Sequence, residues 1–140
     1  MDTAGQEKFQ ALNFQYFKKA DGCLLVYDIS DRESYNEIKN VYLEKIREIC
    51  KEKIKVVLLG NKTDLEDERK VSSEEGAQLS ADNGFIYMET SCLKNTNVAD
   101  SFETLIELTY RDSLEENDKT EKLISINKSS NGNKKKGCCW

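Results

Sequence analysis

The first residues of the chain form a short polar loop whose side chains suit phosphate chemistry. Asp2, Gly5 and Gln6 stand in the pattern D-x-x-G-Q. Glycine lets a backbone amide come very close to a terminal phosphate, and glutamine can orient an attacking water molecule. Asp2 is placed where an acidic residue at a strand end holds Mg²⁺, often through water. Taken alone, this pattern is more often an ordinary turn than a phosphate site.

A second candidate site is the N-K-x-D turn formed by Asn61, Lys62 and Asp64, which directly follows an apolar run. In open α/β sheets, ligands bind beyond the carboxyl ends of the strands, and this turn is expected there. The Asp64 carboxylate can accept from both N1–H and the exocyclic amine of guanine, a pair of donors that adenine does not offer. The Lys62 stem can cover a purine ring, and Asn61 can tie loops together. By itself, the motif is as often a plain polar turn.

A third loop, Glu89-Thr90-Ser91-Cys92, follows another apolar run. A backbone amide at this position can meet O6 of guanine. Three such loops at three successive strand ends, in this order, form a far stronger signal than any one of them. The combination predicts a site for a guanine nucleotide.

Apolar runs and helical patterns alternate between these loops. The unbroken apolar runs predict strands buried on both faces of a parallel sheet, at residues 22–29, 54–60 and 85–88. Apolar residues at helical spacing, and a capping box that opens at Ser72, predict helices at residues 35–49, 72–84 and 98–109. We expect the apolar stripes of these helices, including Phe102 and Ile106, to face the core. This order of elements predicts an α/β fold with right-handed crossovers.

Several longer stretches share a resemblance to one family. They are residues 2–9, 16–22, 25–30, 71–76 and 88–91. Together they resemble the Rab branch of the Ras superfamily of small GTPases, and the likeness covers nearly all of residues 2–110. The resemblance implies a P-loop NTPase-type parallel sheet with flanking helices, and GTP or GDP with Mg²⁺ as the ligands.

The resemblance also implies a role for each matched residue. Gln6 would be the catalytic residue that positions the water, Gly5 would contact the γ-phosphate, and Asp2 would support Mg²⁺. The residues that would hold the guanine are Asn61, Lys62, Asp64, Ser91, Cys92 and Leu93. The last two depart from the family pattern, which usually has alanine and lysine at these positions, although a leucine can still pack on the base.

The chain has no G-x-x-x-x-G-K-[ST] phosphate-binding loop and no first switch. Relative to the family, the N-terminal strands and this loop are missing, so we expect the chain alone to be inactive in hydrolysis. In the family's sheet, the missing first strand lies beside the strand at residues 22–28, which would then form a bare edge. Met1 stands where the family often has an aromatic residue, and we expect it to lie inside a longer reading frame.

The C-terminal residues carry a separate signal. Lys134, Lys135 and Lys136 precede the adjacent pair Cys138 and Cys139. A CaaX box would need a cysteine at position 137, which is glycine. The ending resembles the double-cysteine type that Rab proteins have geranylgeranylated on both thiols, and two lipid chains give stable anchoring. The lysines would add roughly 1 kcal/mol each near anionic lipid. A pair of free thiols on a loose tail is the alternative.

Composition limits the remaining possibilities. The chain has 140 residues and no histidine, which excludes imidazole catalysis and histidine-bound zinc. Its five cysteines do not form a disulfide framework, so a reducing cytosol is expected. We predict a partial small-GTPase domain at residues 1–114 and a flexible tail at 115–140. The domain is acidic on balance and the tail is basic, which favours an anionic membrane over nucleic acid as a partner.

Two functions follow from these predictions. The first is a Rab-like GTPase that, in its complete form, binds and hydrolyses GTP as a switch in vesicle traffic. It would work with effector, exchange and GTPase-activating proteins on the cytoplasmic face of an intracellular membrane, with a cytosolic pool. The second is a lipidated, non-catalytic interaction fragment that cannot bind nucleotide. The reading frame upstream of Met1 would discriminate between them, and we expect the first.

Overall fold

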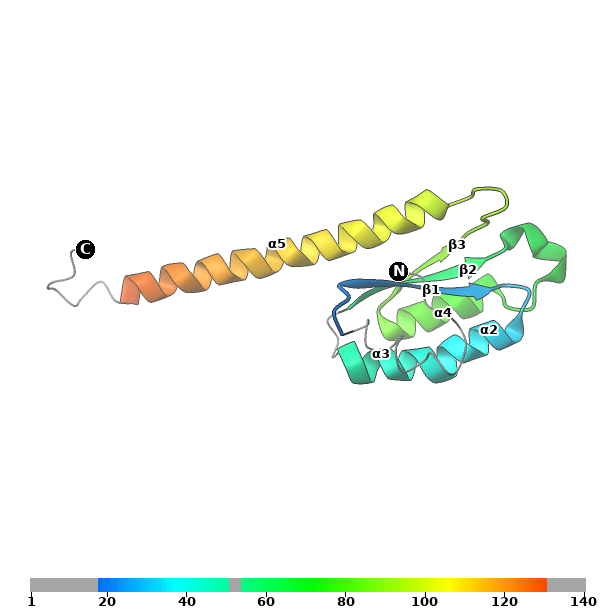
Figure 1. Ribbon diagram of the computed structural model, residues 1–140, viewed down its shortest axis with the longest axis horizontal. Helices are drawn as coiled ribbons and strands as arrows, with labels where there is room; N and C mark the ends of the chain where they lie inside the picture. The colour runs from blue at the N-terminus through cyan, green and yellow to red at the C-terminus, as the bar shows by residue number, and fades with distance from the viewer. Residues whose placement is uncertain (1–17, 51–53, 131–140) are drawn as a thin grey trace, which may run out of the picture.

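The computed structural model of the chain describes residues 18–50 and 54–130, with side chains as far as residue 123. Within these ranges, three parallel strands form a sheet with helices on both faces (Figure 1). The strands lie in the order β1 (Gly22–Asp28), β2 (Lys55–Asn61) and β3 (Ile86–Glu89). The predicted α/β fold with a parallel sheet is confirmed, and each strand begins and ends close to its expected position.

The main core lies under one face of the sheet. Leu25 pairs with Leu58, which pairs in turn with Tyr87, and the side chains of this row point to that face. A continuous helical segment covers it, made of α2 (Arg32–Glu37), the π-helical turn η2 (Ile38–Tyr42) and α3 (Leu43–Cys50). Figure 1 shows this segment and α4 on the same side of the sheet. The long predicted helix is thereby confirmed.

Helix α4 (Ser73–Asn83) has the ends that the sequence predicted. The hydroxyl of Ser72 accepts from the backbone N–H of Glu75 at 3.2 Å, and the Glu75 carboxylate accepts from the backbone N–H of Ser72 at 3.0 Å. The helix ends at Gly84, whose φ of 70° is left-handed. Gly76 faces the sheet so closely that a Cβ there would lie 2.4 Å from Cε2 of Tyr87, so only glycine permits this contact.

Helix α5 (Val98–Ser130) lies on the opposite face of the sheet (Figure 1). It rests on β1 through Leu105 and Thr109, and a Cβ added at Gly22 would lie 2.8 Å from Cδ1 of Leu105. The expectation that the whole apolar stripe is buried is wrong, because Phe102 and Ile106 are 55% and 63% exposed. The reason is that, within the described residues, the sheet ends at β1 and offers no further strand to cover that side of α5.

The structure also differs from the expectation that a flexible tail begins at residue 115. Helix α5 continues to Ser130 and extends well beyond the sheet (Figure 1). Residues 98–130 contain neither glycine nor proline and are rich in glutamate, lysine and leucine, which favour helix. No helix within the described ranges combines the length and the apolar character needed to cross a bilayer.

Candidate functional site

The two loops that follow β2 and β3 meet at the carboxyl edge of the sheet. Asn61 is the last residue of β2, and its Oδ1 accepts from the Thr90 hydroxyl, just beyond β3, at 3.1 Å. Thr63 donates from both its backbone N–H and its hydroxyl to the Thr90 carbonyl, each at 3.2 Å. These bonds join the two loops into one unit.

A carboxylate is held in a fixed orientation within this unit. The hydroxyl of Ser91 donates to Oδ1 of Asp64 at 2.7 Å. Ser91 is only 1% exposed, its backbone pairs with Thr96, and its hydroxyl accepts from the backbone N–H of Lys94. Oδ2 of Asp64 has no hydrogen bond to any described residue. The arrangement therefore orients the carboxylate of a half-buried aspartate, with Oδ2 unbonded by the described residues and a second lone pair of Oδ1 still able to accept.

Lys62 has an unusual backbone conformation, with φ of 66° and ψ of 39°. Its ammonium nitrogen lies 2.5 Å from Oδ2 of Asp28, the last residue of β1. Sequence reasoning gave Asp28 no role. A detectable signal existed, because Asp28 is an acidic residue that ends an apolar strand at the same edge of the sheet as the N-K-x-D turn.

Cys92 and Leu93 lie on the exposed turn that follows Ser91. The backbone N–H of Asn95 donates to the Cys92 carbonyl, and the left-handed φ of Asn95, 51°, helps to close the turn. Leu93 is 82% exposed. The structure thus brings Asn61, Lys62, Asp64 and Ser91 together, and it places Cys92 and Leu93 beside them with the leucine side chain open to solvent.

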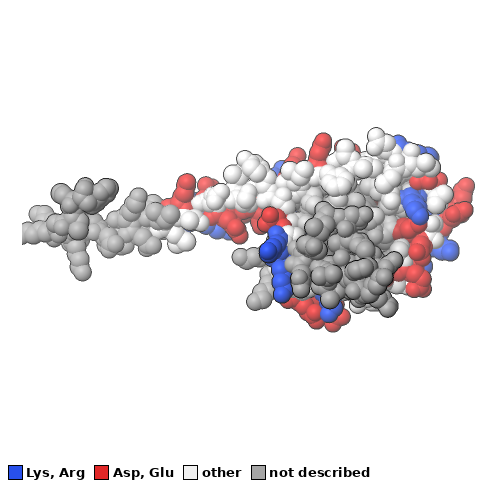
Figure 2. All heavy atoms as spheres, in the orientation of Figure 1, with Lys and Arg blue, Asp and Glu red and all other residues white. Residues whose placement is uncertain are grey.

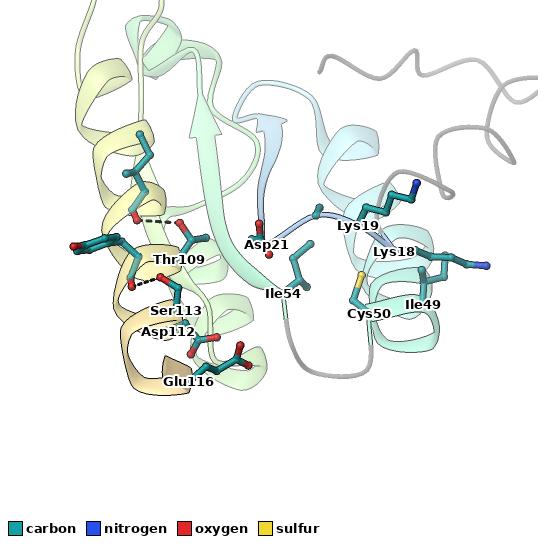
Figure 3. A pocket seen from close by; sticks show the side chains of 13 residues that line it. Lys18, Lys19, Asp21, Ile49, Cys50, Ile54, Thr109, Asp112, Ser113 and Glu116 are labelled. Atoms are coloured by element: carbon teal, nitrogen blue, oxygen red, sulfur yellow. Dashed lines mark hydrogen bonds between the residues drawn. The ribbon is translucent and has the colours of Figure 1, made fainter. Parts of the chain in front are cut away.

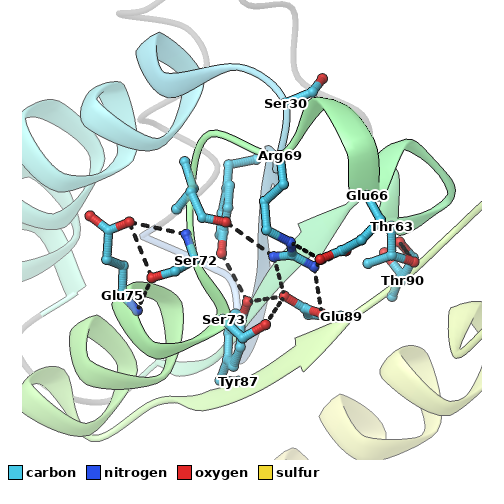
Figure 4. A network of polar contacts seen from close by, with 12 residues as sticks. Ser30, Thr63, Glu66, Arg69, Ser72, Ser73, Glu75, Tyr87, Glu89 and Thr90 are labelled. Carbon is cyan, nitrogen blue, oxygen red and sulfur yellow. Dashed lines mark hydrogen bonds and ion pairs between the residues drawn. The ribbon is translucent and has the colours of Figure 1, made fainter.

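A polar network, which the sequence did not reveal, supports these loops (Figure 4). Arg69 donates to the carboxylate of Glu66 at 2.7 and 2.8 Å and to that of Glu89 at 2.8 and 3.1 Å. Ser73 and Tyr87 each donate to Glu89 at 2.8 Å. Arg69 thereby joins the turn after β2 to the end of β3. Glu89 is the first residue of the third loop, but nothing in the sequence marks Arg69, 20 residues earlier, as its partner.

The electrostatics of the network are consistent with a charged pair. Burial alone would raise the pKa of Glu89, but the hydrogen bonds from Arg69, Tyr87 and Ser73 outweigh it and lower that pKa. The two carboxylates beside Arg69 raise the pKa of its guanidinium. Burial, together with the bonds to Tyr27 and Glu89, raises the pKa of the Tyr87 hydroxyl. Figure 2 shows acidic and basic side chains interspersed at this end of the molecule.

Other predicted site residues lie outside the described residues. They are Asp2, Gly5 and Gln6 of the opening loop, and Lys134, Lys135, Lys136, Cys138 and Cys139 near the C-terminus. In residues 18–50 and 54–123, no group of three or more cysteine, aspartate or glutamate side chains is gathered to hold a metal ion.

A groove of about 710 Å³ lies at the opposite end of the sheet (Figure 3). Asp21 and Ile54, next to the first residues of β1 and β2, line it together with Cys50 from α3 and Tyr110 from α5. Because parallel strands present their carboxyl ends on one edge only, this groove is remote from the loops that follow β2 and β3. It is not part of the candidate nucleotide site.

Comparisons with known proteins agree with the geometry. The sequence model described as the Ras family matches residues 1–111. The Ras-related protein RABA4b of Arabidopsis thaliana is 41% identical over 109 residues, which are 78% of this chain and 48% of that protein. The Ras-related protein Rab-8B of Pongo abelii is 42% identical over 104 residues, 74% of this chain and 50% of that protein. The Ras-related protein Rab-15 of Homo sapiens is 42% identical over 107 residues, which are 76% of this chain and 50% of that protein.

The chain spans about half the length of these relatives. The match nevertheless extends through all three strands of the described sheet and the loops that follow them. The chain is therefore a member of the Ras family, and its relatives place it in the Rab branch.

Proposed function

We propose that this chain is the base-recognising part of a Rab-type small GTPase, a protein that in its complete form binds GTP and GDP and acts as a switch in intracellular vesicle traffic. The observation that carries this proposal is the Asp64 carboxylate. Ser91 fixes one of its oxygens, and the other has no partner among the described residues. Lys62 and Asn61 lie directly beside it in the same turn.

The chemistry of this carboxylate favours guanine over adenine. Guanine presents N1–H and an exocyclic amine side by side, and both can donate to a single carboxylate. Two hydrogen bonds to a charged group contribute about 3–6 kcal/mol together, which corresponds to a dissociation constant of roughly millimolar to tens of micromolar. Without a phosphate-binding loop, this chain is expected to bind nucleotide in that weak range.

The test compares GDP with ADP in titration calorimetry on the 140-residue chain. We expect GDP to bind at least about tenfold more tightly, and Asp64→Asn to remove that preference, because an amide offers one acceptor where the base needs two. Asp67→Asn is the matched control, since Asp67 is an exposed aspartate in the same turn. Equal affinity for GDP and ADP, or a preference that survives Asp64→Asn, would contradict the proposal.

Hydrolysis is proposed for a form that also carries a phosphate-binding loop. When bound, Mg²⁺ and the loop would stabilise the charge of the transferring phosphoryl group. Gln6 would orient the water, with Gly5 near the γ-phosphate and Asp2 near the metal. In such a form, Gln6→Leu is expected to lower the rate of GTP hydrolysis while GDP affinity changes little. An unchanged rate would remove Gln6 from this role.

Membrane attachment is a further part of the proposal. Geranylgeranyl groups on Cys138 and Cys139, together with Lys134, Lys135 and Lys136, would hold the protein on the cytoplasmic face of an intracellular membrane, with a cytosolic pool. Effector, exchange and GTPase-activating proteins would be its partners. Mass spectrometry of protein from cells is expected to find lipid on both thiols. Unmodified thiols on membrane-free protein would contradict this attachment.

The second candidate is a lipidated interaction fragment that binds no nucleotide. The observation that favours it is that the described sheet ends at β1, with no further described strand paired to that edge. It predicts no GDP binding at millimolar concentration, together with lipid on the C-terminal cysteines. The calorimetric comparison with ADP therefore separates the two candidates.

A further inference from the structure

The Lys62 ammonium lies among three carboxylates and bonds to only one of them. Its nitrogen is 2.5 Å from Oδ2 of Asp28. Asp31 and Asp64 are near enough to raise the pKa of Lys62, although the hydrogen bond and the charge of Asp28 raise it more. No hydrogen bond joins Lys62 to Asp31 or to Asp64 within the described residues. The Lys62 ammonium thus pairs with Asp28 at the end of β1 and forms no hydrogen bond with the Asp64 carboxylate.

Asp28 is itself held firmly in place. Its Oδ1 accepts from the backbone N–H of Ser30 at 2.9 Å and from the Ser30 hydroxyl at 2.6 Å. Its backbone N–H donates to the hydroxyl of Ser34 at 3.0 Å. Burial would raise the pKa of Asp28, but the bonds from Lys62 and Ser30 outweigh it and lower that pKa. The carboxylate is therefore charged at neutral pH, with Oδ2 directed to Lys62.

The alternative partner of Lys62 is the residue that the base needs. Asp64 lies two positions further along the same turn, and Ser91 occupies only one of its oxygens. If Asp28 did not hold the ammonium, the attraction between opposite charges would favour contact with Asp64. An ammonium on Asp64 would occupy the oxygen that must accept from guanine.

We propose that Asp28 is a positioning residue of the guanine site, because it holds the Lys62 ammonium away from Asp64 and so keeps the Asp64 carboxylate available to the base. This inference rests on the proposed function of the site. It adds a residue from β1 to a site whose other described members lie at the end of β2 or follow β2 and β3. The recognition of the base then depends on all three strands of the sheet.

The variants are Asp28→Asn and, as the matched control, Asp31→Asn. Both remove one negative charge near Lys62, but only Asp28 bonds to it. Asp31 caps α2 by accepting from the backbone N–H of Glu33 at 3.0 Å, and asparagine is an equally good cap. The two variants therefore separate the specific ion pair from the general loss of charge.

The first measurement needs no ligand. Nuclear magnetic resonance of the lysine side chains reports the exchange of the Lys62 ammonium protons with water. We expect exchange to accelerate about fivefold in Asp28→Asn and less than about twofold in Asp31→Asn, as for the loss of one partly exposed ion pair. Unchanged exchange in Asp28→Asn would overturn the proposal, whatever the nucleotide measurements show.

The second measurement is the dissociation constant for GDP by calorimetry. We expect Asp28→Asn to weaken GDP binding about three- to tenfold, and Asp31→Asn to weaken it less than about twofold. Equal effects of the two variants would overturn the proposal. A wild-type chain that binds no GDP, with Lys62 released in Asp28→Asn, would instead refute the proposed function and remove the guanine role of Asp28 with it.

A milder variant covers the case in which Asp28→Asn fails to fold. Ser30→Ala removes the 2.6 Å hydroxyl bond to Oδ1 of Asp28 and leaves the ion pair in place but less firmly held. It is expected to accelerate the exchange of the Lys62 ammonium about twofold. Exchange as slow as in the wild type, together with unchanged GDP affinity, would count against the role of Asp28.

Discussion

Arg69 joins the turn after β2 to the end of β3, and its replacement by methionine tests how much this ion pair stabilises the fold. Arg69→Met keeps much of the apolar stem and removes every donor of the guanidinium. Among the described residues, it leaves the Glu89 carboxylate with Ser73 and Tyr87 as its remaining donors. The variant therefore leaves the Glu89 carboxylate, which lies between the sheet and α4, without the positive charge of Arg69.

The expected cost follows from the burial of the two partners. The side chains of Arg69 and Glu89 are 15% and 26% exposed. Losing one partner of a fully buried pair costs about 3–5 kcal/mol, and losing one of an exposed pair about 0–1 kcal/mol. The cost for the mostly buried Arg69–Glu89 pair should lie between these limits. The pair with Glu66 adds little to this cost because Glu66 is largely exposed. We expect Arg69→Met to lower the free energy of unfolding by about 2–3 kcal/mol.

The assay is urea unfolding followed by circular dichroism, with Arg32→Met as the matched control. Arg32 bonds to Glu75 at 2.6 Å, which is closer than any contact of Arg69, but these side chains are 43% and 37% exposed. If burial rather than distance sets the contribution, Arg32→Met shifts the midpoint far less than Arg69→Met. An equal or larger shift for Arg32→Met, at unchanged slope, would refute the reasoning.

The Arg69–Glu89 ion pair also predicts how the stability lost in Arg69→Met changes with pH. The folded-state pKa of Glu89 is lowered from its ordinary value of 4.5, so its stabilising contribution is present above that value and is lost as the pH falls through the folded-state pKa. The difference in unfolding free energy between wild type and Arg69→Met is therefore expected to be constant near neutrality and to narrow below pH 4.5. A difference that persists at the lowest pH where both proteins fold would contradict the ionic origin of the effect.

Two further predictions concern close packing and thiol reactivity. Gly76→Ala would place a Cβ 2.4 Å from the Tyr87 ring, so we expect it to cost about 1–3 kcal/mol in thermal unfolding, more than Gly84→Ala, which meets no atom within 4 Å and strains only the backbone. An equal loss for both variants would contradict the packing argument. Burial raises the pKa of Cys23 to about 11, so its alkylation at about pH 8 should be far slower than that of the exposed Cys92. Peptide mapping by mass spectrometry measures both rates, and similar rates would contradict the burial of Cys23.

Much of the fold could be predicted because its signals are local. The apolar run at residues 54–60 is a central strand, and Ser72 with Glu75 forms the capping box that begins α4. Both depend on residues that are neighbours in the chain. The error at α5 has the opposite cause. Periodicity identifies the apolar side of a helix. The position of the sheet edge decides which of those apolar residues are covered, and Phe102 remains exposed.

The candidate site likewise has features that a local sequence pattern predicts and features that depend on contacts between distant residues. Local sequence was enough to predict that Asn61, Lys62 and Asp64 follow one buried strand and that the third loop follows another, because a motif and the strand before it are continuous in the chain. Three contacts became visible in the folded chain alone. Ser91 orients Asp64, Asp28 binds the Lys62 ammonium, and Arg69 joins Glu66 to Glu89. These partners come from different strands and loops. A hydrogen bond depends on distances within a few tenths of an ångström, which strand order and register fix and which no local pattern contains.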